Sequence, residues 1–516
     1  MSAVGGEVEH TTAMAVEEKA KLQKTFRRFD MLLFTVCALV GVDTMGQVSS
    51  YGVATFTWII ILAVAFLLPY ALVMAELGSA FTQEGGPYEW MKLSFGRCAA
   101  GIGSVLYWVT NPLWVGGTLC FTATAAWSAH ISRIGTGTVG DYTFKIIFIW
   151  LSITVAIVSL RYGKWIPNVG AIARLGLLGF FSLTVLIYAI EHGVHGPSLK
   201  HPLGAPGSSA LLLFLGLVPL LLFNYVGFEL QNGAAEEMTN PQRDVPVTVG
   251  WSMIITILAY SIPVFGIVAV LPQSKITGIS GLMDAVTQTF SVYGGAANFL
   301  TDCMVLMYIF ALLTSGAVWM IGSDRIQAVA AYDGAFFRYF GVFNAKLGTP
   351  VRVNVLSGVT STIFMIAALH FATGSNANTF TVVLYLATST TLLSYLLIFP
   401  AGIKLRMNHG HVHRPYMLGK VGNGWMWLCS MVCLAWMVLG SWVALFPGLI
   451  EEATGHSYSV NDAYGVSRMR FELFTLGTLG VIIAFAVIGY IAGAGTRREQ
   501  VDLPLEAGAA APASGD

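Results

Sequence analysis

Charged side chains are scarce in this 516-residue chain: only 10% of its residues are Asp, Glu, Lys or Arg, whereas 55% are hydrophobic. A water-soluble domain of ordinary composition carries about 25% charged residues, so the composition argues strongly against a soluble enzyme. Lys and Arg together number 27, as do Asp and Glu, and no basic excess favours nucleic acid as a partner. The composition indicates an integral membrane protein.

Cysteine is scarce as well, and only the last two of the six residues lie close together: Cys37, Cys98, Cys120, Cys303, Cys429 and Cys433. That last pair is one helical turn apart in an apolar run, which indicates packing rather than a zinc site or a disulfide. The chain also lacks a long polar segment in which a soluble receptor or enzyme domain could fold. Because its apolar runs hold neither a metal-spaced His/Glu set nor a nucleophile–base pair, we predict no cofactor and no enzymatic activity.

Long apolar runs are what the chain has in abundance. A helix needs about 20 mainly apolar residues to cross the hydrocarbon core, and a helix satisfies its own backbone hydrogen bonds there. Twelve runs meet this requirement: 29–51, 54–80, 97–129, 143–160, 166–190, 208–238, 247–271, 296–322, 354–373, 379–403, 423–448 and 471–494. The first is not a cleavable signal, because a polar segment precedes it and no small-residue cleavage site follows. The sequence predicts an all-α membrane protein with twelve transmembrane helices.

Lys and Arg in the connecting segments predict the orientation. With the N-terminus inside, 20 of these residues lie in cytoplasmic segments, Arg325 among them, 6 lie outside, and Arg174 lies within a span. Both ends are therefore expected in the cytoplasm. Residues 1–24 and 499–516 are polar or rich in Ala, Gly and Pro, and we expect them to be disordered. Glu76, Glu84 and Glu89 flank the segment after the second span and are expected to form salt bridges at a gate.

Two of the predicted spans are interrupted by glycine and acidic residues. Residues 41–47 interrupt the first span around Asp43, and residues 224–233 interrupt the sixth around Glu229. If the first ten spans form two five-helix repeats, the interruptions occupy equivalent positions, which is the sequence signature of a substrate site in a secondary transporter. Freed backbone groups and half-helix ends can bind a ligand's ions. A pair of glycine kinks that serve only packing is the alternative.

Three motifs in order resemble the amino acid–polyamine–organocation transporter superfamily. Residues 85–88 read Gly-Gly-Pro-Tyr, residues 236–246 follow Glu-x-x-x-Asn-Pro-x-Arg-x-x-Pro, and residues 331–334 with 348–351 read Ala-Tyr-Asp-Gly and Gly-Thr-Pro-Val. The similarity runs through most of residues 29–403. It implies a 5+5 inverted-repeat fold in which helices 1 and 6 are broken and two further helices follow.

The resemblance to amino acid and amine antiporters of this superfamily also implies pocket residues. Segments 106–108 and 114–116 are similar to their third helix, which implies that Asn111 lies beside the pocket. Phe223 falls at the position of an aromatic gate, and Trp319 at that of a tryptophan that stacks on the substrate. With the residues of the two interruptions, the candidate substrate-binding set is Asp43, Thr44, Met45, Gly46, Asn111, Phe223, Asn224, Gly227, Glu229 and Trp319.

Two departures from the superfamily pattern bear on the substrate. The usual Gly-Ser-Gly of the first span is reduced to Gly-Gln-Val at 46–48, and Asp43 stands where most members have no charge. An intramembrane carboxylate is costly and tends to be partnered by a cation. Asp43 and Glu229 therefore favour an amine or guanidinium substrate, to which cation–π contact with Trp319 would add.

Two alternatives to an amine substrate stay open. A zwitterionic amino acid could bind through free backbone amides of Thr44, Met45 and Gly46. Asp43 would then have only a structural role, for example as the cap of the second half-helix, and the protein would be a neutral amino acid permease.

Arg174 and Glu229 are the candidate coupling residues. Arg174 stands at what resembles the position where proton-coupled relatives carry a lysine and sodium-dependent relatives bind an ion. A fixed positive charge there repels sodium. Arginine does not lose its proton in proteins, so the carrier would be Glu229, because a dry cavity favours the neutral form of a carboxyl group. The alternatives are an Arg174 that snorkels to the headgroups and an ionised Glu229 that staples the broken helix.

These features predict a secondary active transporter that moves amino acids, cationic amines or polyamines across the cell membrane by alternating access. Transport is expected to be independent of sodium, through proton coupling or exchange, and the predicted partners are the substrate, protons and the lipid bilayer. A channel needs a lined pore across the whole bilayer, whereas the polar residues here concentrate at one depth. The predicted division is a tail (1–28), two five-helix repeats (29–191 and 208–403), helices 11–12 (404–494) and a second tail (495–516).

Overall fold

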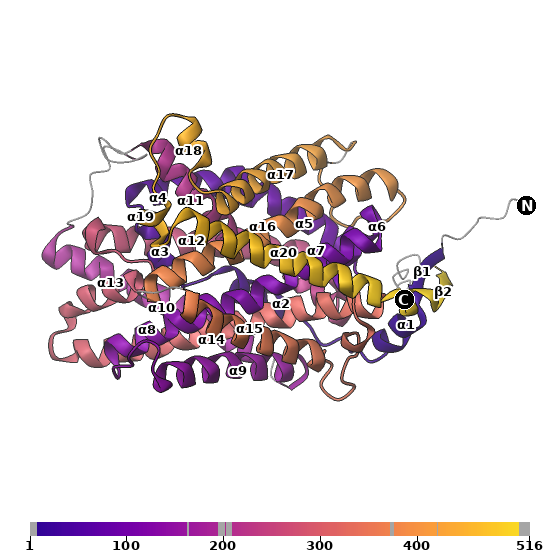
Figure 1. The fold of residues 1–516 in the computed structure, drawn as a ribbon, viewed down its shortest axis with the longest axis horizontal. Helices are drawn as coiled ribbons and strands as arrows, with labels where there is room; N and C mark the ends of the chain where they lie inside the picture. Colours follow the sequence, from indigo (N-terminus) through magenta and orange to yellow (C-terminus); the bar gives the residue numbers. More distant parts are fainter. Residues whose placement is uncertain are drawn as a thin grey trace, which may run out of the picture.

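The long helices run side by side as a bundle in this computed structural model, which describes residues 8–162, 165–194, 202, 209–371, 376–419 and 422–504 (Figure 1). Among those residues the only strands are β1 (Val8–Thr12) and β2 (Gln500–Pro504). Both strands lie at one end of the bundle, which we call the terminal end; the opposite end is the distal end (Figure 1).

The first part of the chain contains the helices α1 to α10. Their bounds are α1 Ala13–Lys19, α2 Arg28–Leu39, α3 Met45–Ser49, α4 Val53–Leu62, η1 Ala63–Leu67, α5 Leu68–Ala80, α6 Gly86–Phe95, α7 Arg97–Trp114, η2 Val115–Leu119, α8 Cys120–His130, α9 Val139–Tyr162 and α10 Trp165–His192. The two π-helical turns, η1 and η2, join α4 to α5 and α7 to α8 without a break. Each pair therefore crosses the bundle as a single rod.

The second part of the chain adds the remaining helices. Their bounds are α11 Ala210–Tyr225, η3 Phe228–Glu237, α12 Pro241–Val270, η4 Gln273–Lys275, α13 Gly281–Phe290, η5 Ser291–Ala296, α14 Ala297–Tyr332, η6 Arg338–Phe340, α15 Val351–Phe371, α16 Asn376–Asn408, α17 Gly424–Leu445, α18 Leu449–Ala453, α19 Val460–Tyr464, α20 Arg468–Ala492 and α21 Ala494–Arg498. The short helices α6 and α13 were not expected from the sequence, because each lies between two predicted spans.

Within the described residues, ten helical segments are long and apolar enough to cross a membrane. Each overlaps one predicted span, although the segment Gly281–Tyr332 also includes α13 and η5. The other two predicted spans, 29–51 and 97–129, correspond to the interrupted pair α2 and α3 and to the rod of α7, η2 and α8. The predicted all-α membrane fold is confirmed, whereas the count of twelve spans stays a prediction.

Helix α14 is longer than the sequence predicted, and this changes the place of Arg325. The helix has 36 residues, which at about 1.5 Å per residue is roughly 54 Å and exceeds the hydrocarbon core of about 30 Å. The interpretation of Arg325 as a loop residue is therefore wrong: its side chain is buried inside α14. The sequence suggests a loop at this position because the charge of Arg325 ends the apolar run. In the structure the buried carboxylates of Glu84 and Glu237 compensate that charge.

The prediction of disordered tails is wrong for residues 8–24 and 499–504. β1 pairs with β2 in antiparallel register, from Val8 opposite Pro504 to Thr12 opposite Gln500. Thr12 Oγ1 also donates to the carbonyl of Tyr332 (2.6 Å), which fastens the strand to the end of α14. Two segments that are remote in sequence satisfy each other's backbone groups here, and no local sequence pattern announces such pairing.

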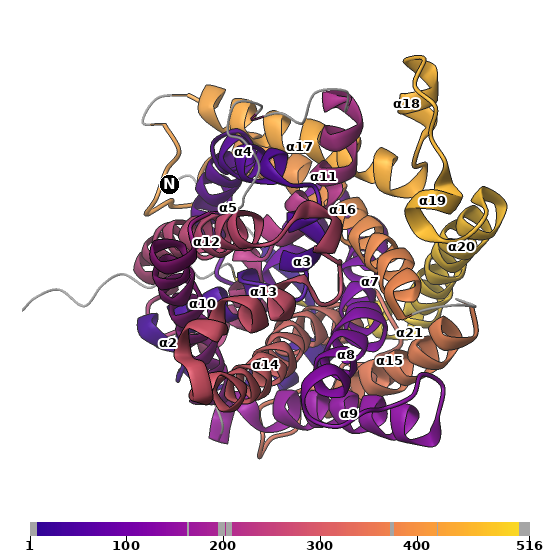
Figure 2. The same cartoon turned by 90° about the vertical axis from the view of Figure 1, so that its left-hand side faces the viewer.

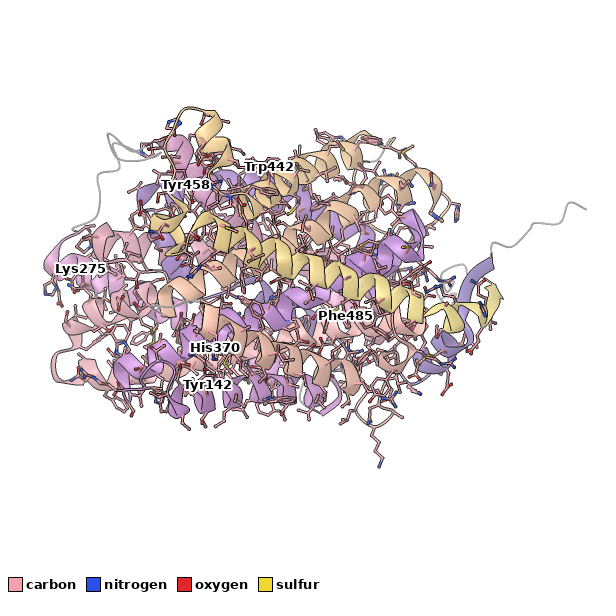
Figure 3. The ribbon with its side chains drawn as sticks, in the orientation of Figure 1. Tyr142, Lys275, His370, Trp442, Tyr458 and Phe485 are labelled. Atoms are coloured by element: carbon pink, nitrogen blue, oxygen red, sulfur yellow. The ribbon has the colours of Figure 1, made fainter. Side chains whose placement is uncertain are left out.

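An end-on view places the interruption of the first span near the middle of the bundle. Figure 2 shows α3 surrounded by longer helices, while α18, α19 and α20 lie at the periphery. Lys275, which the charge pattern assigns to the outside, lies at the distal end, away from β1 and β2 (Figure 3). Phe485 on α20 packs edge-on against Phe336 (ring centroids 5.3 Å apart), so the outer helix is anchored close to the terminal end.

Candidate functional site

The first span is interrupted between Leu39 and Met45. α2 ends at Leu39, Val40 leaves the helical region with ψ at 79°, and α3 begins at Met45. The Tyr260 hydroxyl of α12 holds the break: it accepts from the Gly41 N–H (2.9 Å) and donates to the Leu39 carbonyl (3.0 Å). Backbone groups freed by the break are thus bonded within the protein, as burial in a membrane requires. The predicted interruption of this span is confirmed.

The sixth span is interrupted at Val226 and Gly227. α11 ends at Tyr225, and Gly227 has a φ of 130°, a backbone conformation that favours glycine. The chain then continues as the 3₁₀ helix η3. The Tyr70 hydroxyl of α5 accepts from the N–H groups of Gly227 (2.8 Å) and Phe228 (3.0 Å). This second predicted interruption is confirmed as well.

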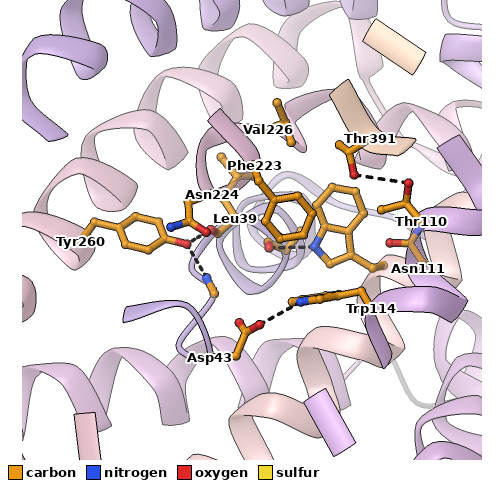
Figure 4. Close-up of a pocket in the computed structure, with 13 residues that line it drawn as sticks. Leu39, Asp43, Thr110, Asn111, Trp114, Phe223, Asn224, Val226, Tyr260 and Thr391 are labelled. Carbon is orange, nitrogen blue, oxygen red and sulfur yellow. Dashed lines mark hydrogen bonds between the residues drawn. The ribbon is translucent and has the colours of Figure 1, made fainter. Parts of the chain in front are cut away.

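A cavity lies where the two interruptions meet α7, α12, α14 and α16 (Figure 4). Its walls combine aromatic rings with a few polar side chains, an arrangement typical of small-molecule sites. The lining residues are Ala38, Leu39, Gly41, Asp43, Thr110, Asn111, Trp114, Phe223, Asn224, Val226, Tyr260, Trp319 and Thr391. Five of the predicted substrate-binding residues are among them: Asp43, Asn111, Phe223, Asn224 and Trp319.

The carboxylate of Asp43 is buried but only partly bonded. Its Oδ2 accepts from the Trp114 indole N–H (2.8 Å), whereas its Oδ1 has no hydrogen-bond partner among the described residues. Asn224, on the other interrupted span, accepts from the Thr44 hydroxyl (2.8 Å), and its Nδ2 has no partner among the described residues. The cavity therefore has one open acceptor and one open donor on its polar wall.

Aromatic side chains form the other walls of the cavity. The rings of Trp114 and Trp319 are nearly perpendicular with centroids 6.4 Å apart, and Phe223 packs edge-on against Trp114 at 6.0 Å. The Trp319 indole N–H donates to the Ala38 carbonyl at the end of α2 (2.9 Å). Trp319 thus joins α14 to the first interruption, and its side chain lines the cavity.

The other five predicted residues lie beside the cavity rather than on its surface: Thr44, Met45, Gly46, Gly227 and Glu229. A Cβ atom on Gly46 would lie only 2.7 Å from the carbonyl oxygens of Thr277 and Gly278, so this glycine allows α3 to approach the segment before α13. Thr44 bonds Asn224, as described above; it is the N-cap residue of α3 and makes no side-chain cap bond to that helix. Asp43 bonds Trp114 instead of capping α3.

Glu229 is enclosed by tyrosines. Its Oε1 accepts from Tyr107 (2.6 Å) and Tyr395 (2.5 Å), and its Oε2 accepts from Tyr70. These tyrosines come from α7, α16 and α5, so the carboxylate joins η3 to three other helices. The alternative that Glu229 accepts mainly backbone N–H groups does not describe this arrangement, because three tyrosine hydroxyls bond its carboxylate. Sequence reasoning missed the enclosure, since a tyrosine in an apolar span does not reveal which way it points.

Arg174 is completely buried and bonds to the end of the first half-helix. Its guanidinium donates to the carbonyls of Cys37 (2.5 Å), Val40 (2.7 Å) and Ala311 (2.9 Å) and to the Ser315 hydroxyl (3.0 Å). The alternative that Arg174 snorkels to the headgroups is wrong. The carbonyl end of a helix carries partial negative charge, and that charge attracts the guanidinium into the protein.

A buried ion-pair cluster lies on α14 between Trp319 of the cavity and Tyr332 at the terminal end. Arg325 on α14 contacts Glu84 (3.0 Å) and Glu237 (3.1 Å), and all three side chains are at most 5% exposed. Arg325 also donates to the Gly348 carbonyl (2.5 Å). We call Glu84, Glu237 and Arg325 the terminal gate. The expectation that glutamates after the second span form salt bridges is confirmed for Glu84, as it is for Glu89 with Lys92 at 2.7 Å.

A second ion pair stands beside the terminal gate. Asp333, just past the end of α14, accepts from Arg97 (2.8 Å) and from the Tyr88 hydroxyl (2.6 Å). Burial alone would raise the pKa of the Asp333 carboxyl, but the charges of Lys92 and Arg97 outweigh it and hold that pKa below its ordinary value. Asp333 is therefore ionised at neutral pH and ties α6 and α7 to α14.

Comparison with known proteins agrees with this architecture. The model of the family described as amino acid permease matches residues 26–461. A Lactococcus lactis protein named "Probable agmatine/putrescine antiporter" is 27% identical over 401 residues, which cover 76% of this chain and 82% of that protein. An uncharacterized transporter of Legionella pneumophila is 28% identical over 429 residues, which cover 81% and 89%.

Solved structures show the same fold at much lower sequence identity. Two mutants of an Eremococcus coleocola manganese transporter superpose with TM-scores of 0.56 and 0.57 at 12% identity, covering 91% of this chain and 94% of theirs. At this identity the match concerns the arrangement of helices alone. The residues of the cavity must therefore be interpreted from their own chemistry.

Proposed function

The chain belongs to the amino acid permease family, and from that premise we propose that it exchanges small cationic amines across the membrane. It is a multi-pass membrane protein and a secondary transporter of amino acids or amines. The proposal narrows this substrate class to molecules with a free amine or guanidinium. Agmatine and putrescine, which the name of the Lactococcus relative mentions, are examples of such molecules.

The unpaired Oδ1 of Asp43 is the observation that carries the proposal. A buried carboxylate oxygen without a partner is costly, and a cationic group in the cavity would compensate it. Trp114 and Trp319 lie on the same cavity, and their ring faces can add cation–π attraction. A neutral amino acid would bring its own carboxylate close to Asp43, and the two like charges would repel each other.

Alternating access would proceed by movement of the two interrupted spans. The terminal gate is paired in this structure, and in the proposed cycle that pairing would close the route from the cavity to the terminal end. Opening that route requires Glu84 and Glu237 to separate from Arg325. The charge pattern supports a cytoplasmic terminal end, so the gate would face the cytoplasm.

Hydrogen bonds of two tyrosines support the proposed division into the repeats 29–191 and 208–403. In this division the remaining parts are the tail 1–28, helices 11–12 (404–494) and the tail 495–516. Tyr260 of the seventh span holds the first interruption, and Tyr70 of the second span holds the sixth. In two inverted five-helix repeats, the first span corresponds to the sixth and the second span to the seventh. The Tyr70 bond therefore corresponds to the Tyr260 bond. This relation is what an inverted repeat implies.

Coupling would rest on Glu229 and Arg174. Protonation of Glu229 would weaken its charge-assisted bonds to the three tyrosines and free η3 to move. Arg174 places a permanent charge against the carbonyl end of α2 and would exclude sodium there by repulsion. Transport would then depend on pH or on a counter-substrate but not on sodium.

Countertransport in proteoliposomes tests the proposal. Vesicles loaded with unlabelled putrescine should accumulate labelled agmatine faster than empty vesicles, and replacement of sodium by choline should leave the rate unchanged. Neutral amino acids, tested as competitors, should inhibit weakly. Saturable uptake of a neutral amino acid that agmatine and putrescine do not inhibit would contradict the amine substrate and favour a neutral amino acid permease.

A further inference from the structure

Three carboxylates that are buried within the described spanning segments have no ion pair: Asp43, Glu229 and Asp324. Other buried carboxylates do have one, as Asp141 does with Lys145 (2.5 Å). Asp43 lines the cavity and Glu229 joins η3 to the surrounding helices. Asp324 takes part in neither arrangement, so its burial without a cation needs a separate explanation.

Asp324 lies where α14 packs against α7 and α15. Its Oδ1 accepts from the Ser357 hydroxyl (2.7 Å) and from the Trp108 indole N–H (3.0 Å), and its Oδ2 lies 2.6 Å from the Asn354 amide. The Trp108 N–H also reaches Ser357 Oγ (2.8 Å). All four side chains are at most 1% exposed. The carboxyl group therefore sits in a closed polar nest made of uncharged partners.

The charged groups on the neighbouring elements are all engaged elsewhere. Arg325, the next residue on α14, points to the terminal gate, and Arg174 of α10 bonds the end of α2. Glu229 of η3 is enclosed by its tyrosines, and Lys145 of α9 pairs with Asp141. The groups that α7 and α15 present to Asp324 are the uncharged ones named above. No described residue compensates a negative charge at Asp324.

The Asn354 amide allows a second arrangement. As placed, its Nδ2 donates to Asp324 Oδ2, while its Oδ1 has no hydrogen-bond partner among the described residues. Turning it over, a choice that the hydrogen-bond network must decide, brings this oxygen to face Asp324 Oδ2. The separation of 2.6 Å is short for an N–H donor and ordinary for O–H···O. A neutral carboxylic acid at Asp324 would supply that O–H.

We propose that Asp324, Asn354, Ser357 and Trp108 form a proton-binding site separate from Glu229, in which Asp324 is held as the neutral acid. The proton sits on Oδ2 and is donated to Asn354, while Oδ1 accepts from Ser357 and Trp108. The site lies on α14 between Trp319 of the cavity and Arg325 of the terminal gate. Opening of the gate would admit water to this part of α14 and allow the proton to leave toward the terminal end.

Infrared spectroscopy of the purified protein at neutral pH tests this site, because a neutral carboxylic acid has a C=O stretching band that a carboxylate lacks. The test compares the wild type with Asp324→Asn, Glu229→Gln and Asn354→Leu. Asparagine is close in shape to the neutral acid and carries the same donor and acceptor, so Asp324→Asn should fold with an unchanged melting temperature. Asp462→Asn, at an exposed position of α19, is the matched control.

The proposal requires Asp324→Asn to lose one carboxylic acid band that Glu229→Gln and Asp462→Asn keep. Asn354→Leu should keep the band but shift its frequency, because it removes the acceptor. This second variant decides the matter if Asp324→Asn fails to fold. An unchanged carboxylic acid region in Asp324→Asn, or an unshifted band in Asn354→Leu, would overturn the assignment. The measurement involves no transport, so its failure would leave the proposed amine exchange untouched.

Discussion

The two interrupted spans are held in the same way but present their carboxylates differently. In each, a tyrosine hydroxyl from a neighbouring span bonds the freed backbone: Tyr260 at the first interruption and Tyr70 at the second. Asp43 keeps one oxygen open beside the cavity, whereas both oxygens of Glu229 are occupied. The common element serves to keep a broken helix stable in the membrane. The difference between the carboxylates indicates where a ligand can bind.

This contrast assigns different tasks to two residues that look alike in the sequence. Each is a single acid in a glycine-rich interruption. An open carboxylate beside aromatic rings can bind a substrate cation. A carboxylate that bonds three helices can instead change how tightly those helices are held. We therefore expect Asp43 to determine which substrate is bound and Glu229 to determine when the protein moves.

Asp43→Asn should have the largest effect. Hydrogen bonds to a charged group contribute about 1.5–3 kcal/mol, so kcat/KM for agmatine or putrescine should fall roughly 10- to 150-fold. Uptake of labelled substrate into proteoliposomes measures this, with the exposed Asp462→Asn as the control. An equal loss for neutral amino acids and amines would remove the distinction between an open and an enclosed carboxylate.

Glu229→Gln should change the pH dependence more than the substrate preference. The ionised carboxylate holds η3 through charge-assisted bonds, so exchange by the wild type should become faster as the pH falls and these bonds weaken. The variant should show a flat pH profile and a roughly tenfold lower maximal rate, equivalent to about 1.4 kcal/mol. Initial exchange rates across a pH series provide the measurement. A variant that retains the wild-type slope would show that the proton binds elsewhere.

Tyr260→Phe should mainly reduce stability. It removes the hydroxyl that bonds the Gly41 N–H and the Leu39 carbonyl, which then keep only their bond to each other, and each lost hydrogen bond costs about 0.5–1.5 kcal/mol. Tyr70→Phe should cost a similar amount and should also alter the pH profile, because Tyr70 bonds Glu229 as well. Melting temperatures and exchange rates of both variants would compare the two tyrosines. Equal pH profiles would contradict the separate task of Glu229.

Lys19→Ala should have the smallest effect. Lys19 pairs with Glu236 on η3 at 2.9 Å, with both side chains about a quarter exposed. Partly exposed pairs contribute about 0–1 kcal/mol, so the exchange rate should change less than about fivefold. Lys24→Ala, at an exposed position close by, is the matched control. A loss as large as that of Asp43→Asn would mean that the N-terminal segment controls the movement of η3.

Sequence reasoning located the interruptions because glycine and acid are rare together inside apolar runs. It also selected Asp43, Asn111, Phe223, Asn224 and Trp319, all of which line the cavity. It could not tell that Gly46 contacts the segment before α13 or that Glu229 is enclosed. Those features depend on which side chains of distant helices face each other. A span's hydropathy does not record that direction.

The amino-acid order by itself determined the membrane class, the helical spans and the two broken positions, because lipid forces each span to be apolar and to satisfy its own backbone. Only the tertiary structure decided which buried charges are compensated. Arg174 bonds backbone carbonyls and Arg325 pairs with carboxylates from remote segments, whereas the side chains that donate to Asp43 and Asp324 are uncharged. Electrostatic energy in a medium of low dielectric constant depends on distances of a few ångströms, and packing of the whole bundle sets those distances.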